Sequence, residues 1–183
     1  EYGMAVNDTA WENRYESISN MVLSETGSAG AVVQVEPLGQ GDIQGFANGI
    51  FSLAVNGEAL PEKYMNIWDL AFDSQGKTLA GSIRKTRTDY GIVNGSACWN
   101  ASFQSAWRPL YVEQDNALVA PVKTAGKWML YKDAKPLWGR QYEQVWKLTG
   151  NTATGKIAAV VCDSFANWTV CDNGADWQTH CDT

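Results

Sequence analysis

Hydrophobic and polar residues alternate with two different periods along the chain. Near the N-terminus four apolar side chains recur at spacings of four, three and four: Trp11, Tyr15, Ile18 and Val22. This is the spacing of one helix face. Thr9 and Glu12 have the spacing of a capping box, and Gly27 follows as a stop signal. The pattern predicts an amphipathic helix over residues 8–24, packed on the rest of the domain.

Beyond Gly30 the chain consists of short runs of β-branched and aromatic residues, interrupted by Gly, Asn, Asp and Pro. The runs predict strands at Ala31–Glu36, Ile50–Val55, Asn66–Phe72, Thr78–Lys85, Ala117–Val122, Trp128–Lys132, Gln144–Leu148 and Lys156–Cys162. Asn56-Gly57 is typical of a type I′ hairpin turn. We therefore expect a mainly β (α+β) single domain. Residues 1–30 would contain the helix, and residues 31–183 would form antiparallel sheets, as a sandwich or a split barrel.

Two segments of the chain resemble each other. Phe51–Leu60 followed by Tyr64–Leu70 aligns with Trp128–Leu137 followed by Tyr142–Leu148. The rare aromatic residues coincide, since Tyr64 meets Tyr142 and Trp68 meets Trp146. This predicts two related units, at about 50–80 and 127–160, packed about a pseudo-twofold axis with Trp68 and Trp146 in the core.

The second of these segments also resembles a known family. Residues 126–138 read GKWMLYKDAKPLW and residues 145–148 read VWKL. They are similar to the repeat of bacterial secreted-repeat lipoproteins, with its Y-x-G-K-P-L-Y hairpin and closing V-W-H. Residues 98–110, CWNASFQSAWRPL, resemble that family's C-x-x-x-C … W-P-P-L segment. The resemblance covers about residues 77–148 and implies a secreted protein with a repeat-built fold, but no particular reaction.

Composition and charge narrow the function classes. The 183 residues are 45% hydrophobic and 19% charged, as in a folded globular protein, and the net charge of -6 disfavours binding to nucleic acid. No apolar run is long enough to span a bilayer. The chain begins without a basic and then apolar leader, so we expect any signal or anchor peptide to have been removed.

The cysteines favour an oxidising compartment. Their number is even and they lack C-x-x-C spacing: Cys98, Cys162, Cys171 and Cys181. Three pairings are open to them. We favour Cys171 with Cys181, which would close a loop of turn-forming residues, and Cys98 with Cys162. The alternative is four buried free thiols in a cytosolic protein.

Four N-x-[ST] triplets fit the same compartment as glycosylation candidates, at Asn7, Asn94, Asn100 and Asn167. A periplasmic or surface protein of a bacterium would carry these triplets unmodified. We therefore expect a secreted, periplasmic or cell-surface protein.

Candidate chemistry is limited by the single imidazole, His180, which lies near the C-terminus in a loop. Imidazole-dependent nucleophilic catalysis is not expected. A pair of carboxylates would suffice for glycoside hydrolysis, and ten are available: Glu58, Glu62, Asp69, Asp73, Asp89, Glu113, Asp115, Glu143, Asp163 and Asp176. The acidic cluster Asp172–Asp176 resembles part of a calcium loop but lacks the distal Glu. We expect no metal and no cofactor.

The chain contains nine tryptophans. Five of them lie near turn signals, cysteines or N-x-[ST] triplets and form a candidate binding surface: Trp99, Trp107, Trp138, Trp168 and Trp177. The alternative is that their indoles cap the ends of a sandwich. The favoured function is binding or assembly, with a glycan, a protein or a second copy as partner, including a role as a filament subunit. The alternative is a small secreted hydrolase that acts on a glycan with two carboxylates.

Overall fold

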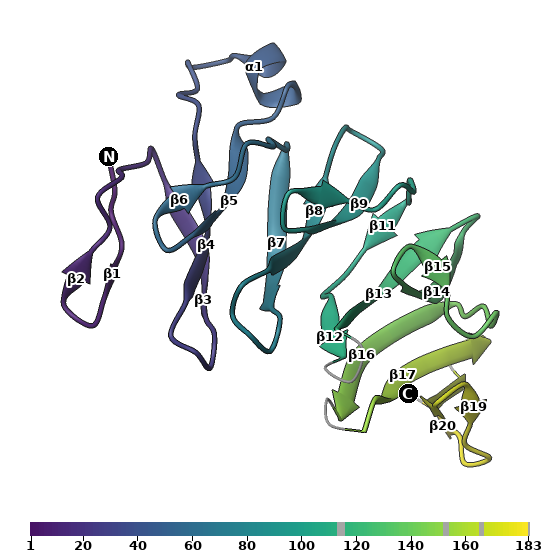
Figure 1. The fold of residues 1–183 in the computed structure, drawn as a ribbon. Coiled ribbons are helices and arrows are strands. Elements are labelled where there is room, and N and C mark those ends of the chain that lie inside the picture. Colours follow the sequence, from purple (N-terminus) through teal and green to yellow (C-terminus); the bar gives the residue numbers. More distant parts are fainter. Residues whose placement is uncertain (113–115, 152–153, 165–166, 183) are drawn as a thin grey trace.

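The computed structural model describes residues 1–112, 116–151, 154–164 and 167–182. These residues form antiparallel sheets of similar design, which fan out side by side along the chain (Figure 1). Its one helix in the described residues is short, α1 (Ile43–Ala47), and Asp42 caps it by accepting a hydrogen bond from the backbone N–H of Gly45. The described residues contain no helix long and apolar enough to cross a membrane.

Each sheet is a meander of consecutive strands. An N-terminal hairpin consists of β1 (Ala5–Val6) and β2 (Thr9–Ala10). Sheet 1 contains β3 (Ile18–Leu23), β4 (Ala29–Gln34), β5 (Phe51–Val55) and β6 (Glu58–Ala59). Sheet 2 contains β7 (Asn66–Phe72), β8 (Leu79–Arg84), β9 (Tyr90–Asn94) and β10 (Ala97–Cys98).

The two C-terminal sheets follow the same order with one strand more each. Sheet 3 contains β11 (Ser105–Ala106), β12 (Leu110–Val112), β13 (Ala117–Thr124), β14 (Lys127–Lys132) and β15 (Lys135–Pro136). Its first strand is split, because β11 and β12 both pair with β13. Sheet 4 contains β16 (Gln144–Asn151), β17 (Lys156–Ser164), β18 (Asn167–Asp172), β19 (Ala175–Asp176) and β20 (Cys181–Asp182).

One backbone bridge recurs and sets the repeat. It joins the start of a third strand to a residue beyond the fourth: Tyr2 to Tyr15, Phe51 to Tyr64, Tyr90 to Phe103, and Trp128 to Tyr142. Tyr64 and Tyr142, which the sequence alignment pairs, thus make the same bridge. A further copy with Phe103 lies between them, so the two segments belong to a longer series and do not pack together about a twofold axis.

In sheets 1, 3 and 4, the turn before the fourth strand is bonded back to the second strand. Asn56, Asp133 and Asn173 all have positive φ, between 45° and 50°, which Asn and Asp tolerate better than most residues. Each accepts a hydrogen bond through its side-chain oxygen from the first part of the second strand, at the backbone N–H of Ala29, Leu118 and Ile157 respectively. Asn56-Gly57 makes a turn with positive φ at both positions, in agreement with the predicted type I′ signature.

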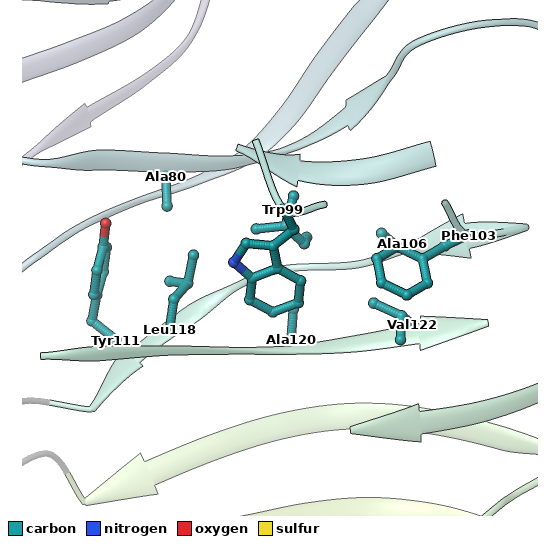
Figure 2. Close-up of a cluster of buried hydrophobic side chains, with 9 residues drawn as sticks. Ala80, Trp99, Phe103, Ala106, Tyr111, Leu118, Ala120 and Val122 are labelled. Carbon is teal, nitrogen blue, oxygen red and sulfur yellow. The ribbon is translucent and has the colours of Figure 1, made fainter. Parts of the chain in front are cut away.

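The hydrophobic core lies between successive sheets. Sheets 2 and 3 enclose one cluster, in which Trp99 and Phe103 reach toward Ala120 and Val122 (Figure 2). A second cluster lies between sheets 1 and 2 and contains Leu53, Ile67 and Leu79, and a third lies between sheets 3 and 4. Because every inner sheet is covered on both faces, its strands are rich in buried Val, Ile, Leu and Ala.

The mainly β prediction is confirmed, and the predicted N-terminal helix is wrong. Residues 9–10 and 18–23 form β2 and β3, and Tyr15 makes a backbone bridge with Tyr2. The apolar stripe divides between two clusters: Trp11, Tyr15 and Ile18 pack between the N-terminal hairpin and sheet 1, whereas Val22 faces sheet 2. Tertiary packing therefore overrides a helical spacing that was produced by a turn and a bulged strand.

The expected sandwich or split barrel is also replaced by a different arrangement. Within the described residues no sheet closes into a barrel, and more than two sheets pack in a row. This packing of four-stranded meanders resembles that of the blades in a β-propeller (Figure 1).

Candidate functional site

The first strand of every sheet is interrupted at the same place. Register shifts occur between Ser19 and Val22, between Trp68 and Ala71, and between Val145 and Leu148. In sheet 3 the equivalent break separates Ala106 at the end of β11 from Leu110 at the start of β12. A bulge of this kind bends the strand and turns its side chains in a new direction. The interruptions point Trp107 and Trp146 into the solvent, where they are 40% and 61% exposed.

The interruptions of sheets 2, 3 and 4 meet in one cleft of about 370 Å³, which we call the bulge cleft. Its lining consists of Asp69, Trp107, Arg108, Pro121, Trp146, Lys147 and Leu148. Each of the three sheets contributes, so a repeated irregularity gathers residues that are far apart in the sequence. Such convergence of aromatic and polar groups in a concave surface is typical of ligand sites.

A second aromatic ring holds each exposed indole of the bulge cleft. Trp107 packs edge to face on Trp128, with ring centroids 5.4 Å apart, and Trp146 packs the same way on Trp168 at 6.1 Å. Trp128 is 7% exposed and belongs to the core between sheets 3 and 4. These contacts restrict the indoles before any ligand arrives, which lowers the entropy that binding would cost.

The polar groups of the bulge cleft carry both signs of charge. Asp69 has a positive φ of 55°, and its carboxylate accepts a hydrogen bond from the backbone N–H of Arg108 at 3.1 Å. The Arg108 Nε lies 4.0 Å from the same carboxylate and most of its side chain is exposed. The guanidinium therefore keeps donors available, and Lys147 adds a further exposed donor.

The five tryptophans of the predicted binding surface do not form one surface. Trp107 lines the bulge cleft, and Trp168 supports Trp146 from beneath. Trp99 is buried between sheets 2 and 3, so its assignment to an exposed surface is wrong. Trp138 is half-buried and packs over Gly174. Trp177 is 56% exposed but lies outside the lining of the cleft.

The predicted core position of Trp146 is wrong as well, because its side chain is largely exposed. Its sequence equivalent Trp68 is half-buried and packs edge to face on Tyr90 at 6.0 Å. The sequence held a signal for this site, since Trp68, Trp107 and Trp146 follow one another at intervals of 39 residues. Asp69, Arg108 and Lys147 each come directly after one of these tryptophans.

All four cysteines are unpaired, so the predicted disulfides are wrong. Cys171 pairs across the sheet with Asp176, whereas Cys181 lies opposite Trp168, three residues away along β18. That separation is roughly 10 Å along the strand, well beyond the Cα distance a disulfide spans. Cys98 belongs to the core between sheets 1 and 2, and Cys162 lies in sheet 4.

The four thiols are expected to differ sharply in reactivity. Burial raises the pKa of the Cys171 thiol, which also lies beside the Asp176 carboxylate, so it should be inert toward Ellman's reagent in the folded protein. Cys181 is exposed and should react first. We expect all four thiols to react in denaturant without any reductant. Fewer than four reactive thiols in denaturant would contradict the unpaired arrangement.

Except for Asp69, the remaining predicted residues that the structure describes lie outside the lining of the bulge cleft. Asn7 and Asn100 are exposed, whereas Asn94 accepts a hydrogen bond from the Tyr111 hydroxyl and Asn167 donates one to Asp163. Glu113 and Asp115 lie outside the described residues. Asp69 is the one acidic residue in the lining of the bulge cleft. The described residues contain no cluster of three or more metal-ligating side chains of His, Cys, Asp or Glu.

Comparison with known proteins adds no relative: no family model matches the chain, and no curated protein matches it. The resemblance to secreted-repeat lipoproteins stays a prediction.

Proposed function

We propose that the chain is a binding module that holds a glycan in the bulge cleft. The observation that carries the proposal is the pair of exposed, ring-supported indoles, Trp107 and Trp146, at equivalent places of neighbouring sheets. Sugar rings combine apolar faces with a rim of hydroxyl groups. Flat indoles suit the faces, and the Asp69 carboxylate and the Arg108 guanidinium suit the hydroxyls.

Binding is a better match to the cleft than hydrolysis. Glycoside hydrolysis requires two carboxyl groups on either side of the scissile bond. The lining of the bulge cleft supplies one, Asp69, which is already engaged by the backbone of Arg108. A secreted or surface location remains part of the proposal, supported by the four N-x-[ST] triplets and by the lipoprotein resemblance, since the cysteines no longer argue for it.

The glycan proposal predicts that Trp146→Ala weakens binding at least about tenfold, because a central aromatic anchor contributes roughly 1.4 kcal/mol or more. The measurement is a glycan array, followed by titration of the best oligosaccharide with tryptophan fluorescence as the signal. Trp146 is exposed, so the variant should fold normally.

Trp177→Ala is the matched control. Trp177 is exposed to nearly the same fraction as Trp146 but lies outside the cleft, so its removal should leave the affinity unchanged. A silent array, or equal loss of affinity in both variants, would refute glycan binding in the bulge cleft.

A further inference from the structure

The bulge cleft contains a cation whose hydrogen-bonding capacity is unused. Arg108 lies at the break between β11 and β12, and its backbone N–H donates to the Asp69 carboxylate at 3.1 Å. The Arg108 Nε lies 4.0 Å from the same carboxylate, which is too far for a hydrogen bond. Among the described residues the Arg108 guanidinium has no acceptor, so its N–H donors remain available to a ligand.

Other arginines of the chain are used to hold the fold together. Arg14 and Arg84 donate to backbone carbonyls, and Arg140 donates to the Asp176 carboxylate. The position of Arg108 differs, because sheets 2 and 4 pack on the two sides of its own sheet and 78% of its side chain is still exposed. The exposure of Arg108 therefore comes from the bulge that interrupts the first strand, within sheets that the structure describes.

The charges in the bulge cleft favour a negatively charged ligand group. Two cations, Arg108 and Lys147, line the cleft together with one carboxylate, Asp69. The chain as a whole has a net charge of -6, so this local excess of positive charge runs against its average. Complementary charge at a site selects the partner that carries the opposite sign.

We propose that the glycan bound in the bulge cleft is acidic, and that a carboxylate on one of its sugar rings binds the Arg108 guanidinium. The inference rests on the proposed function. A planar carboxylate accepts two parallel N–H groups from a guanidinium, and such charge-assisted hydrogen bonds are roughly twice as strong as those to a neutral hydroxyl. Trp107 and Pro121 border the same cleft and supply apolar surface for the sugar ring. A uronic acid combines both features in one residue.

An array of matched oligosaccharide pairs tests the inference on the intact protein. The pairs are oligogalacturonate, oligoglucuronate and oligomannuronate, each beside its methyl ester, in which the same sugar is neutral. We expect at least one acid to bind about tenfold or more tightly than its ester, the gain typical of a hydrogen bond to a charged group. Titration followed by tryptophan fluorescence gives both affinities.

Arg108→Gln tests the role of the guanidinium. The variant should reduce the ratio of acid to ester affinity from about ten toward one, because the remaining amide cannot pair with a charge. Arg87→Gln is the matched control, since Arg87 is an exposed arginine in the turn between β8 and β9 and lies outside the cleft. It should keep the ratio of the wild type.

The outcomes separate this inference from the proposed function. Equal binding of acids and esters, with Trp146→Ala weakening both, would overturn the acidic preference and leave glycan binding in place. No binding by any acidic or neutral oligosaccharide would overturn both. Binding of sulfated oligosaccharides without any uronate would overturn the carboxylate, and an acid preference that survives Arg108→Gln would overturn the role of Arg108.

Discussion

Trp99→Ala should destabilise the protein by about 3–5 kcal/mol, the usual cost of removing a large aromatic side chain from a core. Trp99 is 7% exposed and lies between sheets 2 and 3 with Phe103, Ala106 and Leu118. Its ring packs edge to face on Phe103 with centroids 6.4 Å apart. Removal leaves a cavity in the core between the two sheets. Chemical denaturation followed by circular dichroism measures the loss.

Trp177→Ala tests the effect of burial alone, because Trp177 has the same residue type and the same place in the repeat as Trp99 but is exposed. The backbone N–H of Trp177 donates to Val170, just as that of Trp99 donates to Ile92, so the two tryptophans occupy equivalent places in sheets 4 and 2. Trp177 is 56% exposed, because no further described sheet covers sheet 4. Its removal should change the free energy of unfolding by less than about 1 kcal/mol. Similar losses for both variants would contradict the arrangement of the sheets.

Most of the strands were predictable from local pattern. The eight predicted strands correspond to β4, β5, β7, β8, β13, β14, β16 and β17, with shifts at their ends. Alternating apolar residues and Asn-Gly turns are local signals. They suffice here because each strand of a meander pairs with the strand next to it in the sequence. β9 has the same signals, with Ile92 and Val93 before Asn94-Gly95, and was missed in the sequence. Recognising it would have revealed the copy between the two related segments.

The N-terminal region was not predictable in this way, because its strands depend on distant partners. β2 has two residues, and the Tyr15 hydroxyl donates to the carbonyl of Gly57, which lies 42 residues away. Asn20 adopts a positive φ of 49° inside the bulge of β3 and displaces Val22 from the face that Ile18 occupies. The resulting spacing resembles that of a helix. Pairing with β4 stabilises β3, and no sequence pattern within residues 8–24 indicates this pairing.

The sequence predicted only part of the candidate site. Strict alternation along β16 predicts the direction of side chains only up to a bulge, and the register shift after Val145 reverses it. Val145 is 2% exposed and the adjacent Trp146 is 61% exposed. The alignment of Trp146 with Trp68 in a predicted strand had placed Trp146 in the core. The 39-residue interval predicts that Trp68, Trp107 and Trp146 occupy equivalent positions in their sheets. Which of these side chains a neighbouring sheet buries depends on the packing of the sheets, which the interval does not predict.

Close packing between sheets should make Gly30 intolerant of any side chain. A Cβ at Gly30 would lie 2.8 Å from Leu79 Cδ2 and 3.0 Å from the Phe72 ring, both in the core between sheets 1 and 2. Leu79 is 1% exposed, so its end has no free space to move into. Gly30→Ala should cost roughly 1–2 kcal/mol and Gly30→Val roughly 3 kcal/mol, because overpacking grows with the inserted volume. Thermal and denaturant unfolding measure both values.

Gly39→Ala provides the control for the loss of glycine itself. The nearest atom to a Cβ there is Asp42 Cβ at 4.0 Å, and Gly39 is not among the glycines with positive φ. Alanine at this position lowers the conformational entropy of the unfolded chain without adding a clash to the folded one. The free energy of unfolding should therefore stay equal or rise by up to about 1 kcal/mol. If Gly30→Ala behaves like Gly39→Ala, sheets 1 and 2 are further apart than the structure has them. A graded loss from alanine to valine at Gly30 alone would show that direct contact between β4 and the Phe72 ring sets the spacing of the sheets.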